Sequence, residues 1–180
     1  MELHEIKNKL QSSLTNLYQL DKTLFERNKG RGVCERSLVF RFVYYLQNSL
    51  PDYYVDCDFN SSAIIEIDDT GYARVTEQNG KQILNTDGKK VGRFIDIIVH
   101  KRELDQPNDL FCIEVKKWNN KTKEGTEKDR NNLKKLTSDY GYMYGFHLIL
   151  GRNLESTSIS IFQNGDRISN LISINRFINE

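Results

Sequence analysis

The segment FCIEVKKW, residues 111–118, places charged side chains within an otherwise apolar β-strand pattern. Apolar side chains alternate along one face, whereas Cys112, Glu114, Lys116 and Trp118 fall on the other face. A charge in a protein interior is strongly destabilising unless it is paired. We therefore expect Glu114 and Lys116 to belong to a site that holds several charged groups together.

A second strand pattern, residues 93–100, places Asp96 among apolar residues. If the two strands form an antiparallel hairpin with its turn centred on Asp105, Asp96 lies opposite Glu114. Opposed side chains have Cβ atoms about 5 Å apart, so the two carboxylates repel each other unless a cation lies between them. Oxygen ligands without a His or Cys partner favour a hard ion. The expected cofactor is therefore Mg²⁺, with Mn²⁺ as a substitute.

Lys116 has a chemical role in such a site. Metal-assisted hydrolysis of a phosphodiester requires an attacking water, a metal that polarises the phosphoryl oxygen, and a positive group near the developing charge. Lys116 can orient or deprotonate the water, or stabilise the pentavalent state, and the sequence does not choose among these roles. The alternative is a cross-strand Asp–Lys or Glu–Lys pair on an exposed sheet face, which the apolar flanking residues disfavour.

Glu35 is a third acidic candidate. A helix is expected over residues 34–49, and Glu35 lies on its apolar stripe, where an unpaired Glu is rarely found. From there it can reach the same metal directly or through a water. The alternative is a structural ion pair with Arg93 or Lys116.

Basic residues continue after Lys116 and are interleaved with Trp118 and several Asn. Lysine and arginine neutralise phosphates, and an aromatic ring can stack on an unpaired base. The alternative is a solvated helix face balanced by Glu124, Glu127 and Asp129. The residues expected to bind nucleic acid are Lys117, Trp118, Lys121, Lys123, Lys128 and Arg130.

The remaining sequence predicts elements that cover a sheet. We expect an α/β fold with a mixed central sheet of four or five strands flanked by helices, in a single domain of residues 1–180. One helix is expected over residues 1–29 as an N-terminal extension, with an interruption near Asp21. The other expected helices are residues 127–139 and a short helix within 168–178. Further strands are expected at residues 53–59, 63–67, 142–150 and 158–162, and a polar loop or hairpin insertion at 68–92.

Composition narrows the class of protein. Hydrophobic residues make up 38% and charged residues 28% of the chain, which is typical of a soluble globular protein. The absence of a long apolar run predicts a cytoplasmic location without membrane association. The net charge is +1, so binding to a polyanion would depend on local patches. The scattered cysteines lack the spacing of a zinc site.

The two charged strands resemble a known family. RFIDIIVHKR followed by DLFCIEVKKW is similar to the PD-(D/E)XK nuclease superfamily, with Asp96 as the first acid and Glu114 to Lys116 as the E-x-K element. The similarity in pattern and order covers roughly residues 31–150. One departure is that Phe94 and Ile95, rather than Pro, precede Asp96.

The resemblance implies a restriction-endonuclease-like core and metal-dependent cleavage of nucleic acid. It also implies a metal ligand from the Val115 carbonyl, an accessory acid at Glu35, and further active-site or DNA-contacting groups at Lys128 and Asp129.

The expected function is therefore a Mg²⁺-dependent nuclease or endonuclease acting on DNA, in restriction, phage defence or DNA processing. The alternative is a non-catalytic module that binds nucleic acid or protein on a nuclease-like scaffold. A homodimer or a larger nuclease complex is compatible with either hypothesis. The choice between DNA and RNA, and between single and double strands, stays open at this stage.

Overall fold

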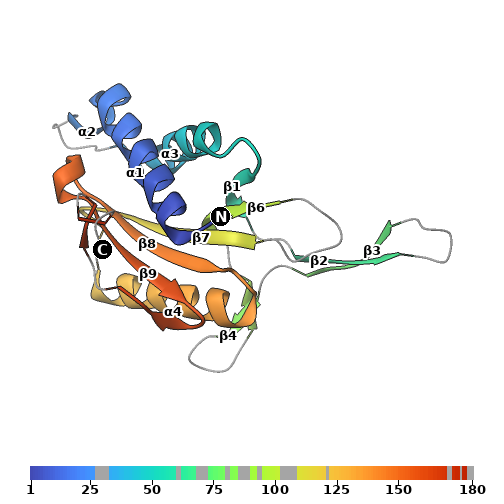
Figure 1. The fold of residues 1–180 in the computed structure, drawn as a ribbon. Coiled ribbons are helices and arrows are strands. Elements are labelled where there is room, and N and C mark those ends of the chain that lie inside the picture. Colours follow the sequence, from blue (N-terminus) through green and yellow to red (C-terminus); the bar gives the residue numbers. More distant parts are fainter. Residues whose placement is uncertain are drawn as a thin grey trace.

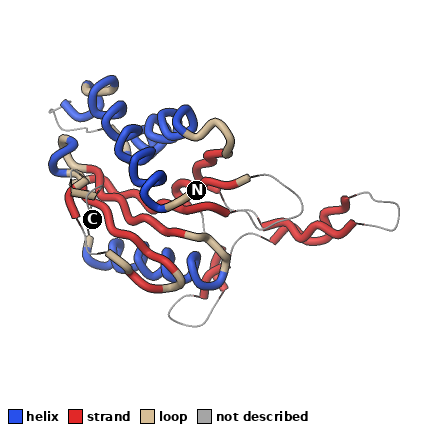
Figure 2. Tube along the Cα trace, in the orientation of Figure 1, coloured by secondary structure: helices blue, strands red, loops and turns tan. Residues whose placement is uncertain are grey.

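Helices lie on both sides of a central β-sheet (Figure 1). The computed structural model describes residues 1–26, 33–59, 62–67, 73–79, 82–84, 90–92, 95–101, 109–120, 122–169, 172–174 and 176–177. Helices α1 (Leu3–Leu20) and α3 (Glu35–Ser49) cover one face, and α4 (Lys123–Asp139) covers the other, as Figure 2 also shows. The short α2 (Thr23–Glu26) follows α1 after the predicted break at Asp21.

The central sheet has seven strands within the described residues, in the order β1-β6-β7-β8-β9-β10, with β11 also paired to β9. Only β7 and β8 are parallel among these pairs, and α4 connects them, as parallel neighbours require. The strands are β1 (Tyr54–Phe59), β6 (Ile95–His100), β7 (Asp109–Lys117), β8 (Tyr144–Leu150), β9 (Ser158–Gln163), β10 (Asp166–Arg167) and β11 (Ile172–Ser173).

The C-terminal region makes this sheet larger than the predicted four or five strands. Asn164 and Gly165 adopt positive φ angles of 51° and 83°, which suits a tight turn between antiparallel strands. The chain after this turn pairs twice with β9, through β10 and β11. The predicted short helix within residues 168–178 is wrong for the described part of this segment, where no residue is helical and Ile172 and Ser173 pair with β9.

The predicted register of the β6–β7 hairpin is confirmed. Ile97 pairs with Ile113 and Val99 pairs with Phe111 in an antiparallel ladder. Continued by one residue, this register places Asp96 opposite Glu114. The predicted turn centre, Asp105, lies outside the described residues.

Two apolar cores lie on opposite faces of the sheet. The larger core is formed by α1, α3 and the facing strand residues, and the smaller core packs Leu133 and Leu136 of α4 against Ile98 and Cys112. Four side chains of α1 are fully buried: Ile6, Leu10, Leu14 and Leu17. The predicted N-terminal extension is thus part of the main core. Within the described residues, no helix is both long and apolar enough to span a membrane.

Two antiparallel pairs outside the central sheet are formed by the predicted insertion at residues 68–92 together with the strand that precedes it. Strand β2 (Ser62–Ile67) pairs with β3 (Ala73–Asn79), and β4 (Gln82–Leu84) pairs with β5 (Lys90–Gly92). In Figure 1 the β2–β3 hairpin extends away from the helices. The strand predicted at 63–67 exists, but it belongs to this hairpin.

Gly151, which follows β8, has no room for a side chain. A Cβ at this position would collide with the hydroxyl of Ser156 and lie 2.5 Å and 2.7 Å from its backbone carbon and oxygen. Gly151→Ala is expected to lower the free energy of unfolding by about 1–3 kcal/mol through overpacking. Denaturant unfolding would measure the loss. The double variant Gly151→Ala/Ser156→Ala should keep most of it, because the backbone contacts remain; full recovery would contradict the explanation.

Candidate active site

Asp96 and Glu114 form a carboxyl pair beneath α4. The backbone N–H of Val115 donates to Asp96 Oδ2 at 2.7 Å, and Asn132 Nδ2 donates to Glu114 Oε1 at 3.3 Å. Continued by one residue, the β6–β7 register places the two carboxyl groups opposite each other on adjacent strands. Burial at this position disfavours their charged forms.

Burial raises the pKa of both carboxyl groups. The pKa of Glu114 is well above its ordinary value, first because of burial and then because of the charges of Asp96 and Asp129. The pKa of Asp96 is also raised, mainly by burial, although the Val115 N–H and the Lys116 ammonium oppose the shift. A divalent cation would counter the repulsion among the carboxylates, which adds to the effect of burial in raising both pKa values.

Lys116 lies beside the carboxyl pair on the same face of β7. Its Nζ is 2.9 Å from Asp129 Oδ2 and 4.0 Å from Glu35 Oε1, and it donates to the Val115 carbonyl at 3.2 Å. Burial alone would lower the pKa of Lys116, but the surrounding carboxylates, Asp129 first, raise it. The ammonium form is favoured, which suits stabilisation of negative charge better than proton abstraction.

Glu35 is positioned by the start of α3. Its Oε2 accepts hydrogen bonds from the backbone N–H of Lys117 at 2.7 Å and from Asn120 Nδ2 at 3.4 Å. These bonds attach the first residue of α3 to the end of β7. Of the predicted partners, Lys116 lies at ion-pair distance and Arg93 is outside the described residues. Glu35 therefore lies next to Lys116 in the site.

Helix α4 supplies two further groups, Asp129 and Asn132. Residues three apart share a helix face, and these two contact Lys116 and Glu114, respectively. The resemblance pointed to Asp129, but Asn132 was not predicted. The sequence feature that could have indicated Asn132 is its position next to Leu133, on the face of the helix that is buried. The helix begins at Lys123, earlier than predicted, because Thr122 Oγ1 accepts a hydrogen bond from the Gly125 N–H at 3.1 Å.

A polar row crosses four adjacent strands under α4. His147 of β8 pairs in register with Glu114, and Ser160 of β9 pairs with His147. His147 is fully buried, and its Nε2 lies 4.0 Å from Asp129 Oδ2. The row extends the site from the carboxyl pair toward β9, which the sequence patterns did not predict.

The predicted nucleic-acid-binding residues separate into two groups. Lys117 is buried, with Nζ donating to the Val33 carbonyl at 2.6 Å, and Trp118 packs beside Phe25 with ring centroids 6.1 Å apart. Both residues therefore stabilise the interior rather than an exposed phosphate track. Of the others, Lys123 and Lys128 are exposed on α4, Arg130 is half-buried 4.0 Å from Glu127, and Lys121 lies outside the described residues.

Asp96 and Glu114 provide two carboxylate ligands for Mg²⁺, which is a small set of protein ligands. Within the described residues, no group of three or more His, Cys, Asp or Glu side chains could hold a metal ion. Magnesium, however, is usually held by one or two carboxylates together with waters and substrate phosphates. Asp96 and Glu114 supply this minimum, and a bound cation would offset the negative charge that burial disfavours. Glu35 does not form a three-residue metal-binding group with Asp96 and Glu114, so it is not a third protein ligand in this structure.

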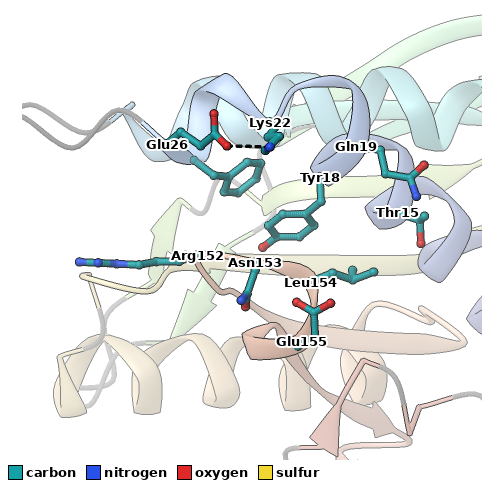
Figure 3. Close-up of a pocket in the computed structure, with 10 residues that line it drawn as sticks. Thr15, Tyr18, Gln19, Lys22, Glu26, Arg152, Asn153, Leu154 and Glu155 are labelled. Carbon is teal, nitrogen blue, oxygen red and sulfur yellow. Dashed lines mark ion pairs between the residues drawn. The ribbon is translucent and has the colours of Figure 1, made fainter.

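A separate cavity of about 360 Å³ lies between the α1–α2 region and the β8–β9 connection. Figure 3 shows Tyr18, Lys22 and Arg152 among its lining residues, none of which was predicted to be functional. The Tyr18 hydroxyl is 2.9 Å from the Gly151 carbonyl and 2.6 Å from Thr157 Oγ1. These bonds give Tyr18 a structural role in the β8–β9 connection.

The candidate site is therefore the cluster on the α4 face of β6 and β7. It combines the two buried carboxyl groups of Asp96 and Glu114 with the ammonium of Lys116. Helix α4 contacts Glu114 through Asn132 and Lys116 through Asp129. This set of groups can hold a hard cation and stabilise negative charge next to it. Comparisons with protein-family models, with curated proteins and with solved structures find no match to the chain.

Proposed function

We propose that the chain is a Mg²⁺-dependent nuclease that hydrolyses phosphodiester bonds, with DNA as its substrate. The observation that carries this proposal is the arrangement of Asp96, Glu114 and Lys116 on one face of two adjacent central strands. The parallel β7–β8 pair with α4 between them further supports a restriction-endonuclease-like core. Roles in restriction, phage defence or DNA processing would suit such an enzyme.

Each residue has a distinct role in this proposal. Asp96 and Glu114 would hold the ion, which when bound supplies a Lewis acid for the phosphoryl oxygen and a more acidic water. Lys116 would place its ammonium near the developing negative charge, and Asp129, at 2.9 Å, would hold that ammonium in place. Glu35 would fix the position of this strand end through the Lys117 N–H.

A non-catalytic binding module is the second candidate. The observation that favours it is that Lys116 Nζ already contacts both Asp129 and the Val115 carbonyl, the carbonyl expected to be a metal ligand. A site satisfied by internal contacts could serve stability alone. The intact Asp96, Glu114 and Lys116 favour the nuclease, because a scaffold has no need for buried like charges.

The first experiment is calorimetric titration of Mn²⁺ into the wild type and into Asp96→Ala. Saturable binding is expected in the wild type and loss of binding in the variant, because one of the two carboxylates is removed. In parallel, single- and double-stranded DNA and RNA would be incubated with the wild type in Mg²⁺, Mn²⁺ or EDTA. Cleavage of DNA that requires the metal and Asp96 supports the proposal. No cleavage of any substrate would overturn it in favour of the binding module.

A further inference from the structure

His147 is a buried titratable residue that the proposed function does not use. It lies in the middle of β8, is fully buried, and pairs in register with Glu114 of β7 and Ser160 of β9. Its ring therefore belongs to the polar row under α4, next to the carboxyl pair. Burying an imidazole costs free energy unless its nitrogens interact with polar or charged groups. The surrounding site must supply such groups.

Asp129 of α4 lies between His147 and Lys116. Its Oδ2 atom is 4.0 Å from His147 Nε2 and 2.9 Å from Lys116 Nζ, so one carboxylate oxygen faces both nitrogens. Asp129 is only 5% exposed, and a buried carboxylate is destabilising unless it is paired. The three side chains thus form a chain of charged and polar groups from β8 through α4 to β7.

The ammonium of Lys116 has more than one place to go. Its Nζ also donates to the Val115 carbonyl at 3.2 Å and lies 4.0 Å from Glu35 Oε1. A lysine side chain is flexible, so these contacts alone do not fix where its charge lies. The contact with Asp129 is the shortest of the three. The position of the Asp129 carboxylate therefore determines where the ammonium lies.

We propose that His147 is a positioning residue, which holds Asp129 against Lys116 and so fixes the ammonium beside the carboxyl pair. An imidazole N–H can donate to a carboxylate, and a ring packed on a central strand has little freedom to move. Asp129 is then held between two adjacent strands rather than by the lysine alone. The catalytic consequence rests on the proposed nuclease function, but the contact between His147 and Asp129 can be tested without cleavage.

The contact is tested first, in EDTA. Nitrogen NMR of the imidazole groups would compare the wild type with Asp129→Asn; the chain has three histidines, and the signal lost in His147→Gln belongs to His147. This signal is expected to shift in Asp129→Asn. Urea unfolding would then follow His147→Leu and Asp129→Asn, singly and together. Residues in contact are not additive, so His147→Leu should cost less stability when Asp129 has already been changed.

The effect on cleavage is tested second. His147→Leu is expected to lower kcat by about 10–100-fold, the usual cost of losing a group that orients a site residue, while KM and the Kd for Mn²⁺ stay near their wild-type values. His147→Gln, whose amide can still donate to Asp129, should keep most of the rate. On a Lys116→Met background His147→Leu should have no further effect. Leu148→Val, in the core on the other face of β8, is the control for lost stability.

Three results would overturn the role of His147. The first is an imidazole signal and a stability cost that do not depend on Asp129. The second is wild-type cleavage by His147→Leu. The third is a loss of Mn²⁺ affinity in His147→Leu as large as its loss of cleavage, because His147 would then act on Glu114. A wild type that cleaves nothing would remove the nuclease proposal, and the NMR and unfolding results would still decide whether His147 holds Asp129.

Discussion

Lys116→Met is expected to lower the rate of Mg²⁺-dependent cleavage by about 10²–10³-fold, the usual cost of removing one preorganised group that stabilises transition-state charge. Methionine keeps the length of the side chain but cannot place positive charge near the phosphate. The single variant would also leave Asp129 as a buried carboxylate without its ion pair of 2.9 Å, which is destabilising. A loss of activity in Lys116→Met alone would therefore have two explanations.

The double variant Lys116→Met/Asp129→Asn separates these explanations. It removes both charges together, so the melting temperature should recover toward that of the wild type while cleavage stays low. Lys123→Met, which changes an exposed lysine on α4, is the control for general loss of positive charge. Steady-state rates and melting curves would be measured for all variants. Wild-type cleavage by the double variant would show that Lys116 has no catalytic role.

The central hairpin was predictable from the sequence because its constraints are local. Strand periodicity places Asp96 and Glu114 on the same face, and the hairpin register then makes them neighbours. The same periodicity failed at Trp118. A turn closed by the Asn120 N–H bonding to the Lys117 carbonyl at 2.9 Å ends the strand, and Trp118 turns toward the α1–α3 core instead. Alternation alone does not show where a strand ends.

The helix contribution to the site was harder to predict, because it depends on tertiary packing. Nothing in the local pattern shows that Asn132 faces Glu114, since that contact requires α4 to cross over β7. The row from Glu114 to His147 and Ser160 depends on the parallel β7–β8 pairing and on β9, which are contacts between distant segments. A polar residue on the apolar stripe of a helix is the one sequence feature that indicates such a contact. Both Asn132 and Glu35 have this feature.

Glu114→Gln is expected to stabilise the metal-free protein at neutral pH. An acid whose pKa is raised on folding binds more protons in the native state than in the unfolded state, so the free energy of unfolding falls as pH rises. For Glu114 this fall begins near its ordinary pKa of 4.5 and continues up to the raised native value. Glutamine has nearly the same shape, can still accept from Asn132, and carries no charge at any pH.

The two proteins should therefore be equally stable near pH 4 and diverge above it. At neutral pH the variant should be more stable by about 1.4 kcal/mol for each pH unit by which folding raises the pKa of Glu114. Urea unfolding in EDTA across this pH range would measure the difference. A variant that is less stable than the wild type at neutral pH would contradict the raised pKa of Glu114.

Metal provides the matching control for this stability difference. A ligand that binds only the native state stabilises it, so Mn²⁺ should stabilise the wild type and have little effect on Glu114→Gln. The advantage of the variant should then shrink or reverse when EDTA is replaced by Mn²⁺. Such a reversal links the two halves of the site: the repulsion between Asp96 and Glu114 that destabilises the metal-free fold is the interaction that a bound cation would convert into affinity.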